Sequence, residues 1–515
     1  MPLPRRHTWV ALSAVLLSAP PVAGPKPTLL VFITVDQLRP DYLDRFKAQL
    51  HGGLARLVNG GAYFVDGHQD HAITETAPGH ASLMSGRFPR STGITRNLAG
   101  VNDPGSPLIG SNDLGASPFR FRGTTLTDWL TTADPATRAL SVSSKDRAAI
   151  LPIGRSKQQV FWLANNGTFT TSSWYADTLP TWVQAFNARR LPQHYAGKAW
   201  VPLLDASAYS EPDSVPFESD RKNVAFPHPF STDSATAAAQ VRYTPIVDEL
   251  TAAVALEGVR AMNLGRGPTT DVLAVSFSAT DYVGHFFGPE SKEQHDQILR
   301  LDRVLGAFLD TLFTLRDSRR IVIALTADHG GGLIPELHGA LRVDPDPALA
   351  AAKAIISKAG GDTMAVDFES GAFFFDPTRA GATVPADQVV TTFIEMARSI
   401  PGVLEAERFA DLGRRDTTKD YIARRWLHMF PDDLIPAAVV TLKEGNIYNY
   451  PIVATHGSPH NYDSHVPIIF YGRPFKPGRY QGFTRTVDLG PTLARVLRIR
   501  PTERLDGRVL KQALK

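Results

Sequence analysis

Carboxylate and imidazole side chains stand at scattered positions of this chain where, together, they could hold metal ions. They are Asp36, Asp281, His285, Asp328, His329 and His465, and the hydroxyl of Thr76 accompanies them. Such ligands suit zinc at neutral pH, with manganese or iron as alternatives. Three ligands on each of two neighbouring ions would leave a position open for substrate. The set therefore predicts two adjacent metal ions with a hydroxyl between them.

Thr76 opens the segment Thr-Ala-Pro-Gly-His, which has the pattern of a helix start. One interpretation is structural: Thr76 would be the N-cap, and Pro78 an early helical position. The other is chemical, because a helix N-terminus attracts phosphate and a metal ion stabilises an alkoxide at neutral pH. With metal ligands present elsewhere in the chain, we expect Thr76 to be a nucleophile. Thr74 is a weaker candidate, since it lies outside the Thr-x-Pro-x-His frame.

Apolar, β-branched runs precede several of these residues. The run at 29–35 is continuous, as in strands buried on both faces of a parallel sheet. Similar runs occupy 139–142, 271–277, 320–326 and 466–471. Asp36, Asp281 and Asp328 follow three of them, at the strand ends where open α/β sheets carry their sites. Asp281 and His285 are four residues apart and would share one face of a helix.

Amphipathic helical patterns alternate with the apolar runs, notably over 233–264 and 291–315. Alternation of this kind predicts a doubly wound α/β fold with a mostly parallel central sheet flanked by helices. Residues 150–230 and 345–435 lack a clear period. We interpret them as insertions, the first of them covering the site, within a single catalytic domain over 25–515.

The N-terminus resembles an export signal. Arg5 and Arg6 precede a short apolar stretch and a small-residue segment ending at Gly24, which predicts a cleaved signal peptide over 1–24. An uncleaved anchor is the alternative, although the stretch is short for a membrane span. The absence of cysteine is compatible with a periplasmic or secreted protein. After processing, no stable membrane span is expected.

The composition limits the possible partners. A net charge of +3, with no run of Lys and Arg, gives no support for a nucleic-acid partner. With 43% hydrophobic and 20% charged residues, the chain is neither disordered nor a multi-span membrane protein. No feature of the sequence indicates an oligomeric state.

The order Asp, Thr-x-Pro-x-His, Asp-x-x-x-His, Asp-His-Gly and a late His resembles the alkaline phosphatase superfamily across almost the whole mature chain. This resemblance implies two Zn²⁺ ions and a phospho-threonine intermediate on Thr76. It implies one ion held by Asp281, His285 and His465, and the other by Asp36, Asp328 and His329 beside Thr76. His465 lies in a segment similar to the family's Tyr-Asp-Thr-His-Val-Pro. His456 and His460 are interpreted as supporting or surface residues.

Three further residues bear on the substrate. Asn97 lies 21 residues after Thr76, a spacing similar to that of both nucleotide phosphodiesterases and phosphate-irrepressible (PafA-type) monoesterases. There the Asn amide binds a phosphoryl oxygen. Lys145 and Arg147 resemble the Lys-x-Arg signature of the monoesterases, whose cations contact the additional anionic oxygens of a monoester. Solvated charges after a strand are the alternative interpretation.

These observations together predict a secreted, two-zinc phosphomonoesterase acting on small-molecule phosphate monoesters. The alternative enzyme is a phosphodiesterase or nucleotide pyrophosphatase of the same superfamily. A third possibility is an exported metal- or phosphate-binding protein without turnover. A sulfatase of the superfamily is excluded, because its formylglycine arises from a Cys or Ser where this chain has Thr76.

Overall fold

The computed structural model of the protein describes residues 25–219 and 221–515. The predicted signal peptide, residues 1–24, lies outside the described residues. Within the described part, no helix is both long enough and apolar enough to cross a bilayer.

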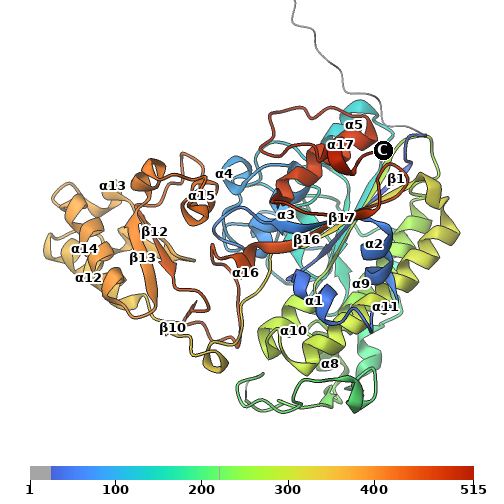
Figure 1. Cartoon of the computed structure of the whole chain (residues 1–515), viewed down its shortest axis with the longest axis horizontal. Helices are drawn as coiled ribbons and strands as arrows, with labels where there is room; N and C mark the ends of the chain where they lie inside the picture. The colour runs from blue at the N-terminus through green and yellow to red at the C-terminus, as the bar shows by residue number, and fades with distance from the viewer. Residues whose placement is uncertain (1–24, 220) are drawn as a thin grey trace, which may run out of the picture.

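A ten-stranded sheet forms the centre of the larger part of the molecule (Figure 1). Its middle strand, β1 (Leu29–Val35), pairs in parallel with β8 (Asp271–Phe277) and with β9 (Ile321–Thr326). Beyond β8 lie β3 (Ala139–Ser143), β4 (Gln159–Leu163) and β5 (Phe169–Thr170). All residues of β1, β8 and β9 are buried, as their continuous apolar sequences predict.

The far edge of the sheet is partly antiparallel. Beyond β9 lie β16 (His465–Tyr471), β2 (Ala62–His68) and β17 (Gly478–Tyr480), while β18 (Thr484–Arg485) also pairs with β2. β16 runs antiparallel to both β9 and β2. The run at 466–471 is therefore a buried strand, as expected. Because it is antiparallel to β9, it begins at the end of the sheet where β1 and β9 finish.

Helices cover both faces of the sheet, which confirms the predicted fold class. α2 (Gly53–Gly60), α9 (Ile246–Ala261) and α11 (Lys292–Leu315) contribute to one core, while α3 (Thr76–Ser85), α5 (Leu126–Ala133) and α17 (Leu489–Leu497) contribute to the other. Along β1, Val31 and Ile33 face the first core, and Leu30 and Phe32 face the second. The helical pattern over 233–264 divides into α8 (Ser234–Val241) and α9, and Pro245 stands immediately before the second helix.

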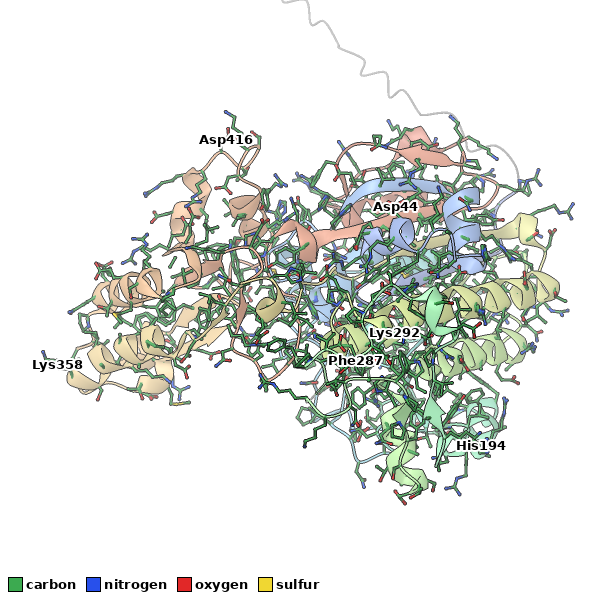
Figure 2. The ribbon with its side chains drawn as sticks, turned by 60° about the horizontal axis from the view of Figure 1, so that its bottom comes forward. Asp44, His194, Phe287, Lys292, Lys358 and Asp416 are labelled. Atoms are coloured by element: carbon green, nitrogen blue, oxygen red, sulfur yellow. The ribbon has the colours of Figure 1, made fainter. Side chains whose placement is uncertain are left out.

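The region 345–435, with the residues that follow it through Tyr448, folds into a lobe beside the sheet domain, drawn in orange at the left of Figure 1. Its antiparallel sheet has the order β11 (Val366–Glu369), β12 (Ala372–Phe375), β14 (Ala438–Leu442) and β13 (Val403–Arg408). α12 (Asp346–Lys358) and α14 (Ala386–Ser399) pack on this sheet around a separate apolar core. Lys358 and Asp416 mark the outer parts of the lobe in Figure 2, away from Phe287 and Lys292 of the sheet domain.

The region 150–230 is less of an insertion than its sequence suggests. Its strands β4 and β5 belong to the central sheet, and α7 (Thr181–Ala188) packs against α9. Further along, the Trp200 indole N–H donates to Asp296 of α11 over 2.8 Å. Within the described residues of this region, the stretch around Phe217 lines a depression together with His285. The lobe, rather than this region, contributes residues such as Glu369, Ser370 and Tyr448 to the cavity beside the site.

Candidate metal centre and active site

The ends of β1 and β9 place three predicted ligands together. Asp36 is the first residue after β1, and Asp328 and His329 follow β9; all three are fully buried. The Nε2 atom of His329 lies 3.4 Å from an oxygen of Asp36 and 3.4 Å from an oxygen of Asp328. Helix α3 packs tightly here, since a Cβ on Gly79 would stand 2.2 Å from the Asp328 carbonyl oxygen. This first group, Asp36, Asp328 and His329, could hold one divalent ion.

A second group forms around Asp281 on α10 (Ala279–Phe287). One turn later on this helix, His285 places Nε2 at 3.3 Å from Asp281 Oδ1. His456 approaches the same oxygen from the loop before β16, with Nε2 at 3.4 Å. The Nδ1 atoms of His285 and His456 lie 2.8 Å from the Ala454 carbonyl and 2.7 Å from the Thr74 carbonyl. Carbonyl partners of this kind orient an imidazole with its other nitrogen available to a metal.

The two groups are neighbours. His329 Nε2 lies 4.0 Å from Asp281 Oδ1, and the rings of His329 and His456 stack with centroids 3.5 Å apart. Asp281, His329 and His456 thus meet the ligand spacing of a metal site, as do Asp36, Asp328 and His329. A pair of adjacent ions suits this arrangement.

His465 does not join either group, contrary to the prediction that it shares an ion with Asp281 and His285. Its Nε2 lies 2.8 Å from the Val65 carbonyl oxygen, and its ring stacks on His68 with centroids 5.0 Å apart. The cause is the strand: His465 begins β16 and faces the neighbouring strand β2. His456, interpreted from the sequence as a supporting residue, occupies the expected place. His460 stays away from both groups, with Nε2 on the Leu442 carbonyl.

Thr76 is the first helical residue of α3, and Glu75 takes the N-cap position that the sequence assigned to Thr76. The Glu75 side chain makes no capping hydrogen bond to the first turn. The Thr76 hydroxyl is therefore not used as a cap, and its Oγ1 lies 3.5 Å from Nε2 of His329. The hydroxyl is almost completely buried and borders the first group.

Asn97 lies over the start of α3. Its Oδ1 accepts the Ala77 N–H over 2.9 Å, and its own N–H donates to Glu75 Oε2 over 2.7 Å. Because Oδ1 faces Ala77, the amide NH₂ is directed away from the helix backbone. Asn97 is thus held beside Ala77, the residue after Thr76.

Lys145 lies between the two groups. Its ammonium is 2.5 Å from Asp36 Oδ2 and 2.5 Å from Asp281 Oδ2. It also lies 4.9 Å from the ring centre of Tyr282. The guanidinium of Arg147, on α6 (Asp146–Ile150), has a buried Nε without a hydrogen-bond partner. Lys145 therefore supports the ligand carboxylates, a role the sequence did not indicate, while Arg147 forms a long ion pair with Asp146 at 3.6 Å.

Burial and mutual repulsion govern the ionisation of the cluster. Burial, together with the negative charge of Asp36, raises the pKa of Asp328. Burial would also raise the pKa of Asp36, but the Lys145 ammonium together with hydrogen bonds from His329 and Asp328 holds that pKa below its usual range. Burial would lower the pKa of His329, yet the charges of Asp328 and Asp36 raise it to about 9. Burial and the neighbouring His329 lower the pKa of His456 to about 3.

The donor set fits divalent metal ions. The Oδ1 atom of Asp36 and the Oδ2 atom of Asp328 are buried and accept no hydrogen bond within the described residues. Buried carboxylate oxygens without donors are costly unless a cation compensates them. Oxygen and imidazole nitrogen together match the ligand preference of zinc.

Comparison with known proteins identifies the family. The model of the type I phosphodiesterase / nucleotide pyrophosphatase family matches residues 30–445. Alkaline phosphatase PhoK of Sphingomonas sp is 32% identical over 95% of this chain and 92% of its own. The chain belongs to this family, within the alkaline phosphatase superfamily. Alkaline phosphatase PafA of Elizabethkingia meningoseptica is 30% identical, with 93% and 92% of the two chains covered.

The solved structure of PafA has the same fold as this PafA-type chain. It superposes with a TM-score of 0.89, at 28% identity, over 96% of this chain and 100% of its own. A PafA variant with a replaced threonine, asparagine, lysine and arginine also superposes, with a TM-score of 0.87, at 27% identity, over 96% and 100% of the chains. Those four positions have the same spacing as Thr76 to Asn97 and Lys145 to Arg147.

Several site residues were not predicted as such. Besides His456, they include Glu75, which accepts from Asn97, and Gln37, whose Nε2 donates to Asp281 Oδ1 over 3.1 Å. Gln37 has φ of 60°, a left-handed conformation, and its main-chain N–H donates to Asp328 Oδ1. His80 lies with Nδ1 3.2 Å from Asp328 Oδ2. Of these, only His80 stood in a recognisable motif, Thr-x-Pro-x-His.

Metal binding to the chelator-treated protein should release a proton from His329 at pH 7.5. With its pKa raised above 6.5 to about 9, this imidazole is protonated there and must lose its proton to become a ligand. We expect about one proton per chain, and an affinity that rises as the pH approaches 9. Zinc calorimetry in buffers of different ionisation enthalpy measures this number. Binding without proton release at pH 7.5 would contradict it.

His456→Ala and His465→Gln should differ in their effect on phosphate-ester hydrolysis. Loss of a ligand to a catalytic ion removes several kcal/mol of transition-state stabilisation, so His456→Ala should slow turnover by about 10³-fold. His465→Gln should keep turnover close to that of the unchanged protein, because His465 contacts neither group. Steady-state rates of aryl phosphate hydrolysis measure both effects. A larger loss of turnover in His465→Gln than in His456→Ala would contradict the assignment of His456 as a metal ligand.

Proposed function

We propose that this protein hydrolyses phosphate monoesters at two zinc ions, through a phospho-threonine intermediate on Thr76. One observation carries the proposal: the Thr76 hydroxyl, at the N-terminus of α3, lies 3.5 Å from Nε2 of His329 in the first metal-type group. Relatives named alkaline phosphatases, matched over nearly their whole length, support it.

Two sets of residues would hold the ions. Asp281, His285 and His456 form one set, and Asp36, Asp328 and His329 form the other, with Thr76 beside it. When bound, zinc supplies Lewis acidity, which favours the alkoxide form of a hydroxyl and polarises phosphoryl oxygens.

The chain's own groups then account for the transfer. Thr76 Oγ1 attacks phosphorus, its new P–O bond forms as the ester P–O bond breaks, and the alcohol departs on the opposite side. Water next attacks the phospho-threonine, releases inorganic phosphate and restores the hydroxyl. The Asn97 amide, held by Ala77 and Glu75, would donate to a phosphoryl oxygen in both steps.

A preference for monoesters rests on Lys145 and Arg147. A monoester dianion exposes one more anionic oxygen than a diester, and cations offset that charge. Lys145 lies between the two groups, and the electrostatic field of Asp36 and Asp281 also reaches Arg147. The corresponding pair in PafA, together with its threonine and asparagine, has been replaced in a solved variant, which supports this placement.

The leaving group would occupy a cavity of about 370 Å³ between the sheet domain and the lobe. Asn97, His285 and His456 line its catalytic side, and Tyr448 and Tyr450 line the side of the lobe. Export to the periplasm or the medium, by the signal at 1–24, is part of the same proposal.

Thr76→Ala should abolish phospho-enzyme formation while both metal ions remain bound, because Thr76 is outside the carboxylate and imidazole sets. Thr76→Ser, which keeps a hydroxyl, is the matched control. Acid quenching with ³²P-labelled substrate measures the intermediate, and elemental analysis measures the metal. Full turnover in Thr76→Ala would disprove the nucleophile.

Arg147→Ala should reduce kcat/KM for an aryl phosphate monoester roughly ten- to hundredfold, and for a bis-aryl diester much less. A lost charge-assisted hydrogen bond of about 1.5–3 kcal/mol gives this range. Arg155→Ala, at a partly exposed arginine whose guanidinium donates to the Phe119 carbonyl, is the control. Equal losses on both substrates, or a faster diester reaction in the unchanged protein, would favour the phosphodiesterase alternative.

A further inference from the structure

A third group of metal-type side chains lies outside the catalytic cluster. We propose that Asp66, His68 and His465 bind an additional divalent transition-metal ion, with zinc as the best match. Their ligand atoms all lie within 4.8 Å of one another. This inference does not depend on the proposed function.

The pairing of two strands brings the three side chains together. His465 stands directly opposite His68 in the antiparallel ladder of β16 and β2. Asp66 is two residues before His68 on β2, so both side chains point to the same side of the sheet. Directly opposed residues and their i−2 neighbours lie close enough for side chains to share one ligand.

The side-chain distances suit a cation. His68 Nε2 lies 2.8 Å from Asp66 Oδ1, and the two imidazole rings lie within 18° of parallel with centroids 5.0 Å apart. Two imidazole nitrogens and one carboxylate oxygen form a three-ligand site that leaves further positions for water. Nearly half of the Asp66 side chain is exposed, so an ion can reach the site from solvent.

The outer nitrogens of both rings are already held by hydrogen bonds. His465 Nε2 lies on the Val65 carbonyl oxygen, which can only accept a proton, so Nδ1 of that ring carries a lone pair. Ser464 Oγ donates to the Gln69 carbonyl over 2.8 Å and lies 3.1 Å from His68 Nδ1. Because Arg425 Nη2 donates to the same Nδ1 over 3.3 Å, the Nε2–H of His68 donates to Asp66 in the metal-free protein, and a metal ion would take the place of that proton. Metal-binding histidines typically show such outer partners.

Positively charged groups lie nearby, around the buried carboxylate of Asp70. The Arg425 guanidinium is 3.6 Å from that carboxylate, and Arg424 and Arg485 pair with it at 3.1 Å and 2.9 Å. Asp70 offsets part of the repulsion that a metal ion would meet from them. Once bound, the ion would link β2 to His465, the first residue of β16. This residue follows the loop that carries His456.

Zinc-edge anomalous diffraction on crystals of the full mature chain, soaked in zinc chloride, tests the site directly. We expect a peak among Asp66, His68 and His465 that is separate from peaks at the catalytic cluster. Peaks at the catalytic cluster alone would overturn the proposal, while a peak here alone would leave it intact and count against the two-ion centre.

Variants give a second measurement in solution. Asp66→Asn and His465→Gln should each bind about one zinc fewer per chain than the unchanged protein, by elemental analysis after desalting, and should lose part of the rise in Tm with added zinc. The control is His338→Gln, which removes a histidine lying 2.8 Å from Glu290 in an exposed pair. Unaltered zinc content in both test variants, or an equal loss in the control, would also overturn the proposal.

Discussion

The convergence of three buried carboxylates is the constraint on which the rest of the site depends. Asp36, Asp281 and Asp328 lie at most a few per cent exposed within one cluster, and their charges oppose one another. Such a cluster is stable only with compensating cations. Lys145 supplies one by bridging Asp36 and Asp281, and two main-chain N–H groups donate to Asp328 Oδ1. Metal binding would use the same negative charge, so stability and catalysis draw on one electrostatic feature.

The sheet produces this convergence. β1 lies between β8 and β9 in parallel register, with Thr34 opposite both Ser276 and Thr326. Three acidic residues that follow these strands must therefore meet at one edge, although the sequence separates them by hundreds of residues. Tight backbone packing completes the arrangement, since Gly79 lets the first turn of α3 approach Asp328 closely. The packing of α3 against Asp328 thus also positions Thr76, the candidate nucleophile, at this end of the sheet.

Much of this could be predicted because it follows from local patterns. Apolar runs identified β1, β3, β8, β9 and β16, and the motifs at Asp36, Thr76, Asp281 and Asp328 lie where the fold class requires. His456 could not be predicted in the same way, because it lies in an irregular loop without period, fixed by the Thr74 carbonyl far away in sequence. His465 was assigned wrongly because a strand-adjacent histidine looks like the other ligands, but pairing of β16 with β2 turns it towards His68.

The lobe and the sheet domain have separate cores, yet polar contacts connect them at the site. Glu75, the N-cap of α3, accepts from the Asn97 N–H with one oxygen and from the Ser370 hydroxyl of the lobe with the other, over 2.7 Å and 2.6 Å. Beside it, Arg96 pairs with Glu369 of the lobe at 2.5 Å. The orientation of Asn97 towards a phosphoryl group therefore depends on the lobe, although the metal ligands do not come from its sheet. Changes in the lobe can accordingly alter which esters are accepted without altering the chemistry that cleaves them.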